Sequence, residues 1–273
     1  MLTKVEITNV RGDVLSLPLF DFSGGYQVKN IEGLDPVKAS LTSSSMAQVD
    51  GAQPQASRRD IRNVTARIEF KPNYSDNTVE SLRKALYAYL MPKSVIKLDF
   101  YIDGVYYAWT NGTVETFENS RFAQIPEMNT SIICYDPDFC APSDVTVTGS
   151  TVADTTTQTI TYGGSTDTGI IFTLNVNRTI TGFTLHNNKP DGTTQSFDID
   201  VPLVSGDVVT ITTIPRQKSA IKTVSGTPTS VLYGVQPSSA WINFGPGDNL
   251  FRASVSGAAI PWTLSYTPRY GAL

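Results

Sequence analysis

The segment Ile170–Val176, IIFTLNV, decides the fold class of this chain. Phe172, Leu174 and Val176 occupy every second position and alternate with polar residues, which is the period of a half-buried strand. The same alternation recurs in short downstream runs, at Phe183–Leu185, Phe197–Val201 and Val209–Ile211. Turn-forming sequences separate the runs: Tyr162-Gly163-Gly164, Lys189-Pro190-Asp191-Gly192, Ser205-Gly206-Asp207 and Gly245-Pro246-Gly247-Asp248. Short strands at spacings of about ten residues predict a β-sandwich of two antiparallel sheets over residues 142–273.

Upstream of this region, strands accompany a single helix. The run Arg62–Phe70, RNVTARIEF, places Val64, Ala66, Ile68 and Phe70 on one face, which predicts a further half-buried strand. A helix is expected over about residues 77–91 because apolar residues recur there at helical spacing. Its expected N-cap is Asn77, with Glu80 three residues later. We expect this helix to cover one side of a sheet.

The passage Asp136–Asp144, DPDFCAPSD, is rich in proline and aspartate and marks the expected boundary between two domains. The first domain then spans residues 1–141 and the second spans residues 142–273. The predicted fold class is mostly β with one helix, made of an α+β first domain and an all-β second domain.

A long polar stretch, Ser43–Asp60 (SSSMAQVDGAQPQASRRD), separates two predicted strands. Loops beyond roughly 12–15 residues are uncommon within compact domains and usually serve a partner or are disordered. Two interpretations of this stretch stay open. It is either an extended arm of about residues 43–60 that lies on another molecule, or a mobile loop with solvated arginines.

Composition excludes several classes of function. The chain has 21 Lys and Arg against 25 Asp and Glu, a formal net charge of −4, and no basic cluster suited to nucleic-acid phosphates. His186 is the single histidine, so neither a histidine metal site nor a Ser-His-Asp triad is expected. Asp198 and Asp200 fit the solvated face of one strand. The sequence therefore predicts no enzymatic activity, no metal and no cofactor.

Aromatic residues of the second domain allow a different function, because sugar rings stack on exposed aromatic faces. The candidate carbohydrate contacts are Tyr233, Trp241 and Trp262, although both tryptophans are equally placed to close the sandwich core. A carbohydrate-binding adhesion protein is thus the alternative to a structural role.

Several longer stretches resemble the distal tail proteins of long-tailed (siphovirus-type) bacteriophages. They are NIEGLDPVKASLTSSSMAQVDGAQPQASRRDIRNVTARIEFKPNY (30–74) and SLRKALYAYLMPK (81–93) in the first half, with YGGSTDTGIIFTLNV (162–176), GDVVTITTIPRQKSAI (206–221) and SSAWINFGPGDNLFRAS (238–254) in the second. The resemblance extends from about Val28 to Arg269. It implies a belt-forming first domain and a second domain similar to galectins and carbohydrate-binding modules.

The same resemblance implies a structural hub of the phage tail tip. Six copies would form a ring between the tail tube protein and the tail-tip or central hub protein, with DNA passing through a channel and with host attachment downstream. Six chains at −4 would together carry a net charge of about −24, and DNA could pass through a ring of this charge without sticking. No membrane partner and no specific nucleic-acid contact are expected, whereas a host surface glycan is a further candidate. The protein would be made in the host cytoplasm and end in the virion.

Within such a ring, the stretch 43–60 is expected to reach a neighbouring subunit. Arginine forks pair well with carboxylates, so the expected inter-subunit contacts are Met46, Asp50, Arg58, Arg59, Asp60 and Arg62.

Overall fold

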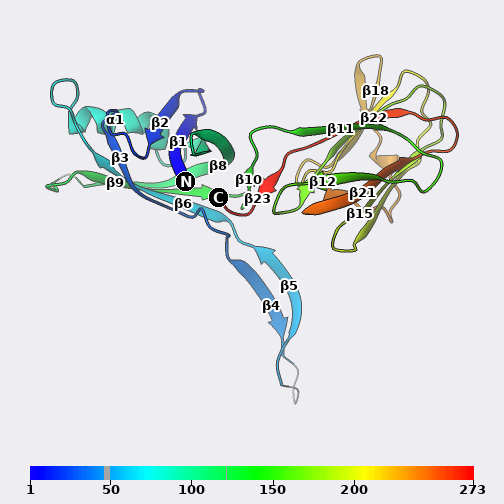
Figure 1. Cartoon of the computed structure of the whole chain (residues 1–273), viewed down its shortest axis with the longest axis horizontal. Coiled ribbons are helices and arrows are strands. Elements are labelled where there is room, and N and C mark those ends of the chain that lie inside the picture. Colours follow the sequence, from blue (N-terminus) through cyan, green and yellow to red (C-terminus); the bar gives the residue numbers. More distant parts are fainter. Residues whose placement is uncertain (46–49, 121) are drawn as a thin grey trace. The chain divides into compact units, whose positions relative to one another are not determined.

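The computed structural model of the chain describes residues 1–45, 50–120 and 122–273 (Figure 1). It consists of two compact units, one formed by Met1–Pro142 together with Gly271–Leu273 and the other by Ser143–Tyr270. The predicted second domain, 142–273, differs from the second unit at both ends, because Pro142 and Gly271–Leu273 lie in the first unit. The last three residues belong to the first unit because Leu273 donates its N–H to the Leu34 carbonyl, 3.1 Å away.

The first unit is built on one antiparallel sheet with the strand order β2-β1-β7-β8-β9-β6-β3. Apolar side chains alternate along these strands and line the inner face of the sheet, as the period of two predicts. The strands are β1 (Leu2–Asn9), β2 (Val14–Pro18), β3 (Tyr26–Glu32), β6 (Arg62–Phe70), β7 (Val95–Ile102), β8 (Val105–Asn119) and β9 (Glu127–Cys134), with the short β10 (Phe139–Cys140) beside β8.

The helix expected over about 77–91 is present as α1 (Val79–Leu90). Its N-cap is Thr78 and not Asn77: the Thr78 hydroxyl accepts from the Ser81 N–H at 3.2 Å, and the Ser81 hydroxyl accepts from the Thr78 N–H at 2.9 Å. The Asn77 side chain instead accepts from the N–H of Asn73. Leu82, Leu86 and Leu90 form the buried stripe of the helix.

Strands β7 and β8 are joined by the two residues Asp103 and Gly104. Both have positive φ, +50° and +81°, which fits the right-handed twist of paired strands and favours an Asp-Gly sequence.

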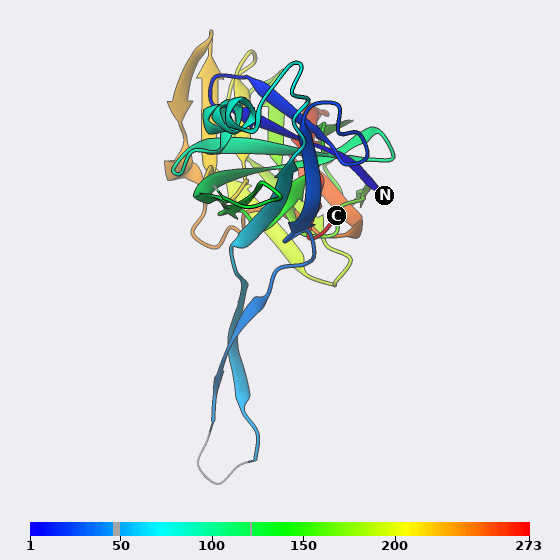
Figure 2. The same ribbon diagram turned by 90° about the vertical axis from the view of Figure 1, so that its left-hand side faces the viewer.

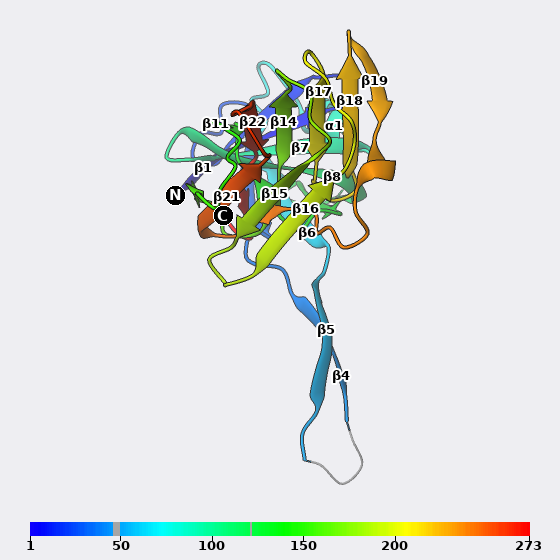
Figure 3. The same cartoon turned by 90° about the vertical axis from the view of Figure 1, so that its right-hand side faces the viewer.

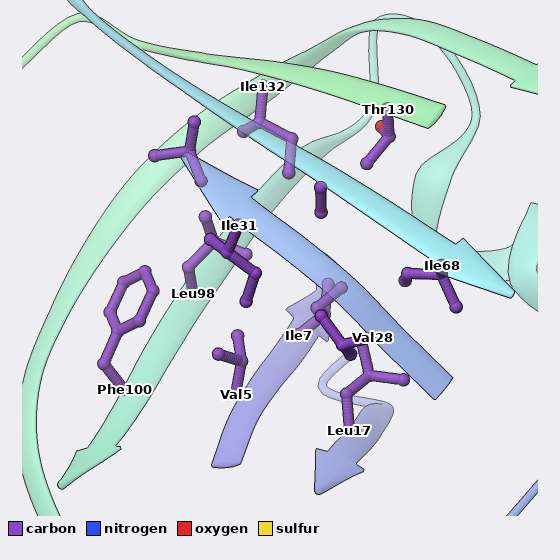
Figure 4. Close-up of a pocket in the computed structure, with 12 residues that line it drawn as sticks. Val5, Ile7, Leu17, Val28, Ile31, Ile68, Leu98, Phe100, Thr130 and Ile132 are labelled. Atoms are coloured by element: carbon purple, nitrogen blue, oxygen red, sulfur yellow. The ribbon is translucent and has the colours of Figure 1, made fainter. Parts of the chain in front are cut away.

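The core of the first unit is apolar and contains a cavity of about 20 Å³. Figure 4 shows Leu98 and Ile132 from the sheet centre and Val28 from the edge strand β3 around it. Its one side-chain oxygen belongs to Thr130, which donates to the Thr116 carbonyl at 2.9 Å. A water needs two or more polar partners, so this cavity is a packing defect rather than a ligand site.

The second unit is a sandwich of two main antiparallel sheets, ordered β11-β22-β14-β17-β18-β19 and β12-β21-β15-β16. Figure 3 shows β22, β14, β17 and β18 side by side. Phe172, Leu174, Leu185 and Phe197 point into one core with no exposed surface. The elements are β11 (Val145–Ser150), β12 (Gln158–Tyr162), β13 (Thr168–Gly169), β14 (Ile171–Asn175), β15 (Phe183–Asn188), β16 (Thr194–Ile199), β17 (Val208–Thr212), β18 (Ser219–Val224), β19 (Thr227–Ser230), the 3₁₀ turn η1 (Leu232–Gly234), β20 (Asn243–Phe244), β21 (Gly247–Ser254), β22 (Pro261–Tyr266) and β23 (Arg269–Tyr270).

The predicted fold class is confirmed: the chain is mostly β, with one α-helix among the described residues.

Candidate functional site

The polar stretch between the strands β3 and β6 contains an antiparallel hairpin, formed by β4 (Ala39–Ser44) and β5 (Gln53–Arg59). It starts four residues before the predicted arm and forms a two-stranded sheet of its own. Every residue of β5 is exposed, and Leu41 of β4 is 77% exposed. Figure 2 shows the hairpin running away from the sheet of the first unit. A lone two-stranded hairpin is marginally stable in water, so this one is suited to lie against another surface.

The base of the hairpin is fixed to the first unit by polar contacts. Arg59 binds the carboxylate of Asp138 with both of its terminal nitrogens, one of them at 2.9 Å. Asp138 is almost fully buried whereas Arg59 is partly exposed. On the other side, Ser40 donates to Asp60 at 2.9 Å, and the Asp60 N–H donates to the Lys38 carbonyl at 3.0 Å. These contacts set the direction in which the hairpin leaves the sheet.

Arg62, the first residue of β6, is completely buried beneath this base. Its guanidinium lies 4.1 Å above the Phe139 ring. It donates to four backbone carbonyls, those of Gly33, Asp35 (2.8 Å), Pro137 (2.8 Å) and Gly271 (2.6 Å). Burial lowers the pKa of Arg62. One side chain therefore joins the segment that leads into the hairpin, the turn before β10 and the C-terminal residues.

The residues predicted to contact a neighbouring subunit thus lie in different environments. Asp50 and Arg58 are exposed on the hairpin, whereas Arg59 and Asp60 hold its base. Met46 lies outside the described residues. The prediction for Arg62 is wrong because its donors all face its own chain.

The sequence did contain a signal for the burial of Arg62. Arg62 lies an even number of residues from Val64, Ile68 and Phe70 on the same strand, so the alternation that buries those residues also turns Arg62 inward.

The three candidate carbohydrate contacts also differ in their exposure. Trp262 is only 3% exposed and packs against Phe251 at 5.4 Å between ring centroids, so its prediction as a sugar contact is wrong. It shares the inward parity of Leu264 and Tyr266 on β22. Trp241 is half-buried and packs on Phe197 at 5.0 Å. Tyr233 is 78% exposed on η1.

Groups capable of catalysis are dispersed. His186 is half-buried on β15; burial and the Arg252 guanidinium lower its pKa, and Asp198 opposes them. Among residues 1–45, 50–120 and 122–273, no three His, Cys, Asp or Glu side chains gather as a metal site would require. No helix in those ranges has the length and apolar character to span a membrane.

The second unit matches a known family over most of its length. Residues 163–270 match the sequence model of the siphovirus-type tail component, C-terminal domain. This match agrees with the family resemblance inferred from the sequence. A component of this kind is part of the tail of the virion. No curated protein matches the chain.

One solved structure shares the fold over nearly the whole chain. The crystal structure of the Dit protein (gp 19.1) of phage SPP1, described as a paradigm of the hub adsorption apparatus in phages that infect Gram-positive bacteria, superposes with a TM-score of 0.69. The two chains share 13% identity over 97% of this chain and 98% of the other. Structures of the phage P2 baseplate in its activated conformation, with Ca and with Sr, give TM-scores of 0.46 and 0.43 at 8% and 9% identity. They cover 100% and 96% of this chain, and 100% and 97% of theirs.

Proposed function

We propose that this protein is the structural hub of a phage tail tip, without enzymatic activity. In this role, copies of the chain, six by family resemblance, close into a ring that joins the tail tube to the tail-tip and host-recognition proteins. DNA passes through the ring. In this proposal the first unit forms the ring and the second unit forms the outer sandwich, the roles expected for residues 1–141 and 142–273.

The observation that carries the proposal is the hairpin β4–β5. Every residue of its two strands is exposed except Ser40 and Ser44 of β4, which are half-buried. A hairpin that buries so little of its own surface gains stability when a second molecule covers it. A hairpin on one subunit and a different surface on the next make a heterologous contact, which generates rings when the rotation closes.

The fold of SPP1 Dit, a protein described as a hub, supports the same role for this chain. The family match to a tail component restricts the setting to a phage tail.

The test is assembly on purified tail tubes. The full chain is mixed with tubes that lack their tip, and the tube ends are viewed by negative-stain electron microscopy. We expect a ring at one end of each tube, and a chain in which residues 41–57 are replaced by a short Gly-Ser turn should leave the ends bare. Tube ends that stay bare with the unmodified chain would refute the hub.

A second function, adhesion to host glycans through the sandwich, is favoured by one observation, the exposure of Tyr233. A glycan array probed with the full chain and with Tyr233→Ala tests it. Binding that is lost in the variant supports adhesion, and an array without signal removes it.

A further inference from the structure

The outer face of the sheet in the first unit carries a polar groove of about 370 Å³ across the strands β8, β9, β6 and β3. The strand registers place one row of side chains across it, consisting of Thr116, Ser131, Thr65 and Glu32. The next row is Glu118, Asn129, Arg67 and Asn30. At a spacing of about 4.8 Å between strands, the groove spans roughly 14 Å.

This face has an excess of negative charge. Arg67 is neutralised by Glu127, with 2.7 Å between Nε and Oε2. Glu32, Glu115 and Glu118 add three carboxylates that form no ion pair with any residue the structure describes. Glu32 accepts a hydrogen bond from the Asn30 amide at 2.7 Å, and Glu115 accepts one from the Ser131 hydroxyl at 2.8 Å. A cationic group that binds to this face would therefore meet carboxylates that are not already neutralised.

The hairpin has a face that complements the groove. Ser40 pairs with Arg58 and Thr42 pairs with Ala56, so these four side chains lie on one side of the ribbon. Three are small, and Arg58 is exposed with no ion pair among the described residues. Arg59 lies on the opposite side and is bound to Asp138. One face of the hairpin thus offers small side chains and a single available cation.

We propose that the groove seats the stem of the hairpin from an adjacent copy of this chain, with Arg58 against the carboxylates of Glu115 and Glu118. The inference rests on the proposed ring and names the surface that receives the hairpin. A second copy supplies the stem because the base contacts of Arg59 and Asp60 direct each hairpin away from its own sheet (Figure 2). Hairpin and groove are different surfaces, as a closed head-to-tail ring requires.

A charge exchange tests this contact in the full chain. Arg58→Glu and Glu118→Arg each place like charges together, and we expect each to weaken ring assembly at least about tenfold. The double variant restores opposite charges and should assemble to within about threefold of the unmodified chain. Assembly is followed by native mass spectrometry and by occupancy of tube ends, at low and at high salt. The matched control is Lys84→Glu, which makes the same charge change at an exposed position on α1 and should leave assembly unaltered.

The possible outcomes separate this inference from the proposed function. Rings that tolerate both single variants overturn the groove contact and leave the hub intact. Single variants that fail without rescue in the double variant overturn it too, because Arg58 then meets another surface, such as that of a tail tube protein. An unmodified chain that never assembles refutes both the hub and the groove contact. Unchanged melting temperatures of all variants exclude misfolding as the cause.

Discussion

Replacement of Arg62 by methionine should destabilise the first unit strongly. Methionine keeps an apolar stem of similar length over Phe139 but removes every donor. The carbonyls of Gly33, Asp35, Pro137 and Gly271 then lose their partner in a fully buried site. At about 1 kcal/mol net for each hydrogen bond, the loss is about 4 kcal/mol. For a unit of this size, that lowers the melting temperature by about 10–15 °C.

Hydrogen exchange measured along a urea series in the full chain resolves the two units and checks this value. Peptides from the strands β6 and β9 should lose protection at lower urea, whereas those from β14 and β17 should not change. The matched control is Arg67→Met on the same strand, whose side chain is 57% exposed and whose ion pair should be worth under about 1 kcal/mol. Equal effects of the two substitutions would refute the idea that Arg62 fastens the base of the hairpin.

Three further predictions concern the second unit and the hairpin base. Burial opposes ionisation of Asp207, but Lys222 at 2.7 Å and the Val204 N–H at 2.9 Å outweigh it and lower its pKa below 3.8; its stabilisation is present above pH 3.8 and is lost as the pH falls through the folded pKa. Acid titration of the melting temperature should therefore be flatter in Asp207→Asn, and equal slopes would contradict this assignment. Trp262→Ala should cost about 3–5 kcal/mol by leaving a cavity, whereas Tyr233→Ala should stay within about 0.5 kcal/mol, as calorimetry can measure. Asp138→Asn should loosen the hairpin base and speed proteolysis between residues 39 and 59 without changing the melting of the second unit; unchanged cleavage would contradict the role of Arg59 and Asp138.

Alternation alone identified much of the fold. The periods of Phe172–Val176 and Val64–Phe70 correctly oriented those strands, since burial on one face leaves a direct record in the sequence. The helix was also recognised, but its first turn was misassigned. Asn77 and Thr78 are both good caps, and the choice depends on Asn77 binding the N–H of Asn73, a contact that spacing does not reveal.

The candidate site was harder to predict. Arginine forks suit carboxylates, which predicts a contact of Arg62 with a neighbouring subunit, whereas the alternation along β6 turns this residue inward. Its partners come from residues 33, 35, 137 and 271, and only the tertiary fold brings these carbonyls together. The polar groove was missed for a related reason: it combines four strands whose order, β8-β9-β6-β3, does not follow the chain.

The mass of the assembled protein tests the ring most directly. Native mass spectrometry of the full chain, alone and after release from tail-tube ends, should give a closed species of six times 29.7 kDa, about 178 kDa. It should be absent when the hairpin is replaced by a short turn. A species of 29.7 kDa under both conditions would contradict the ring.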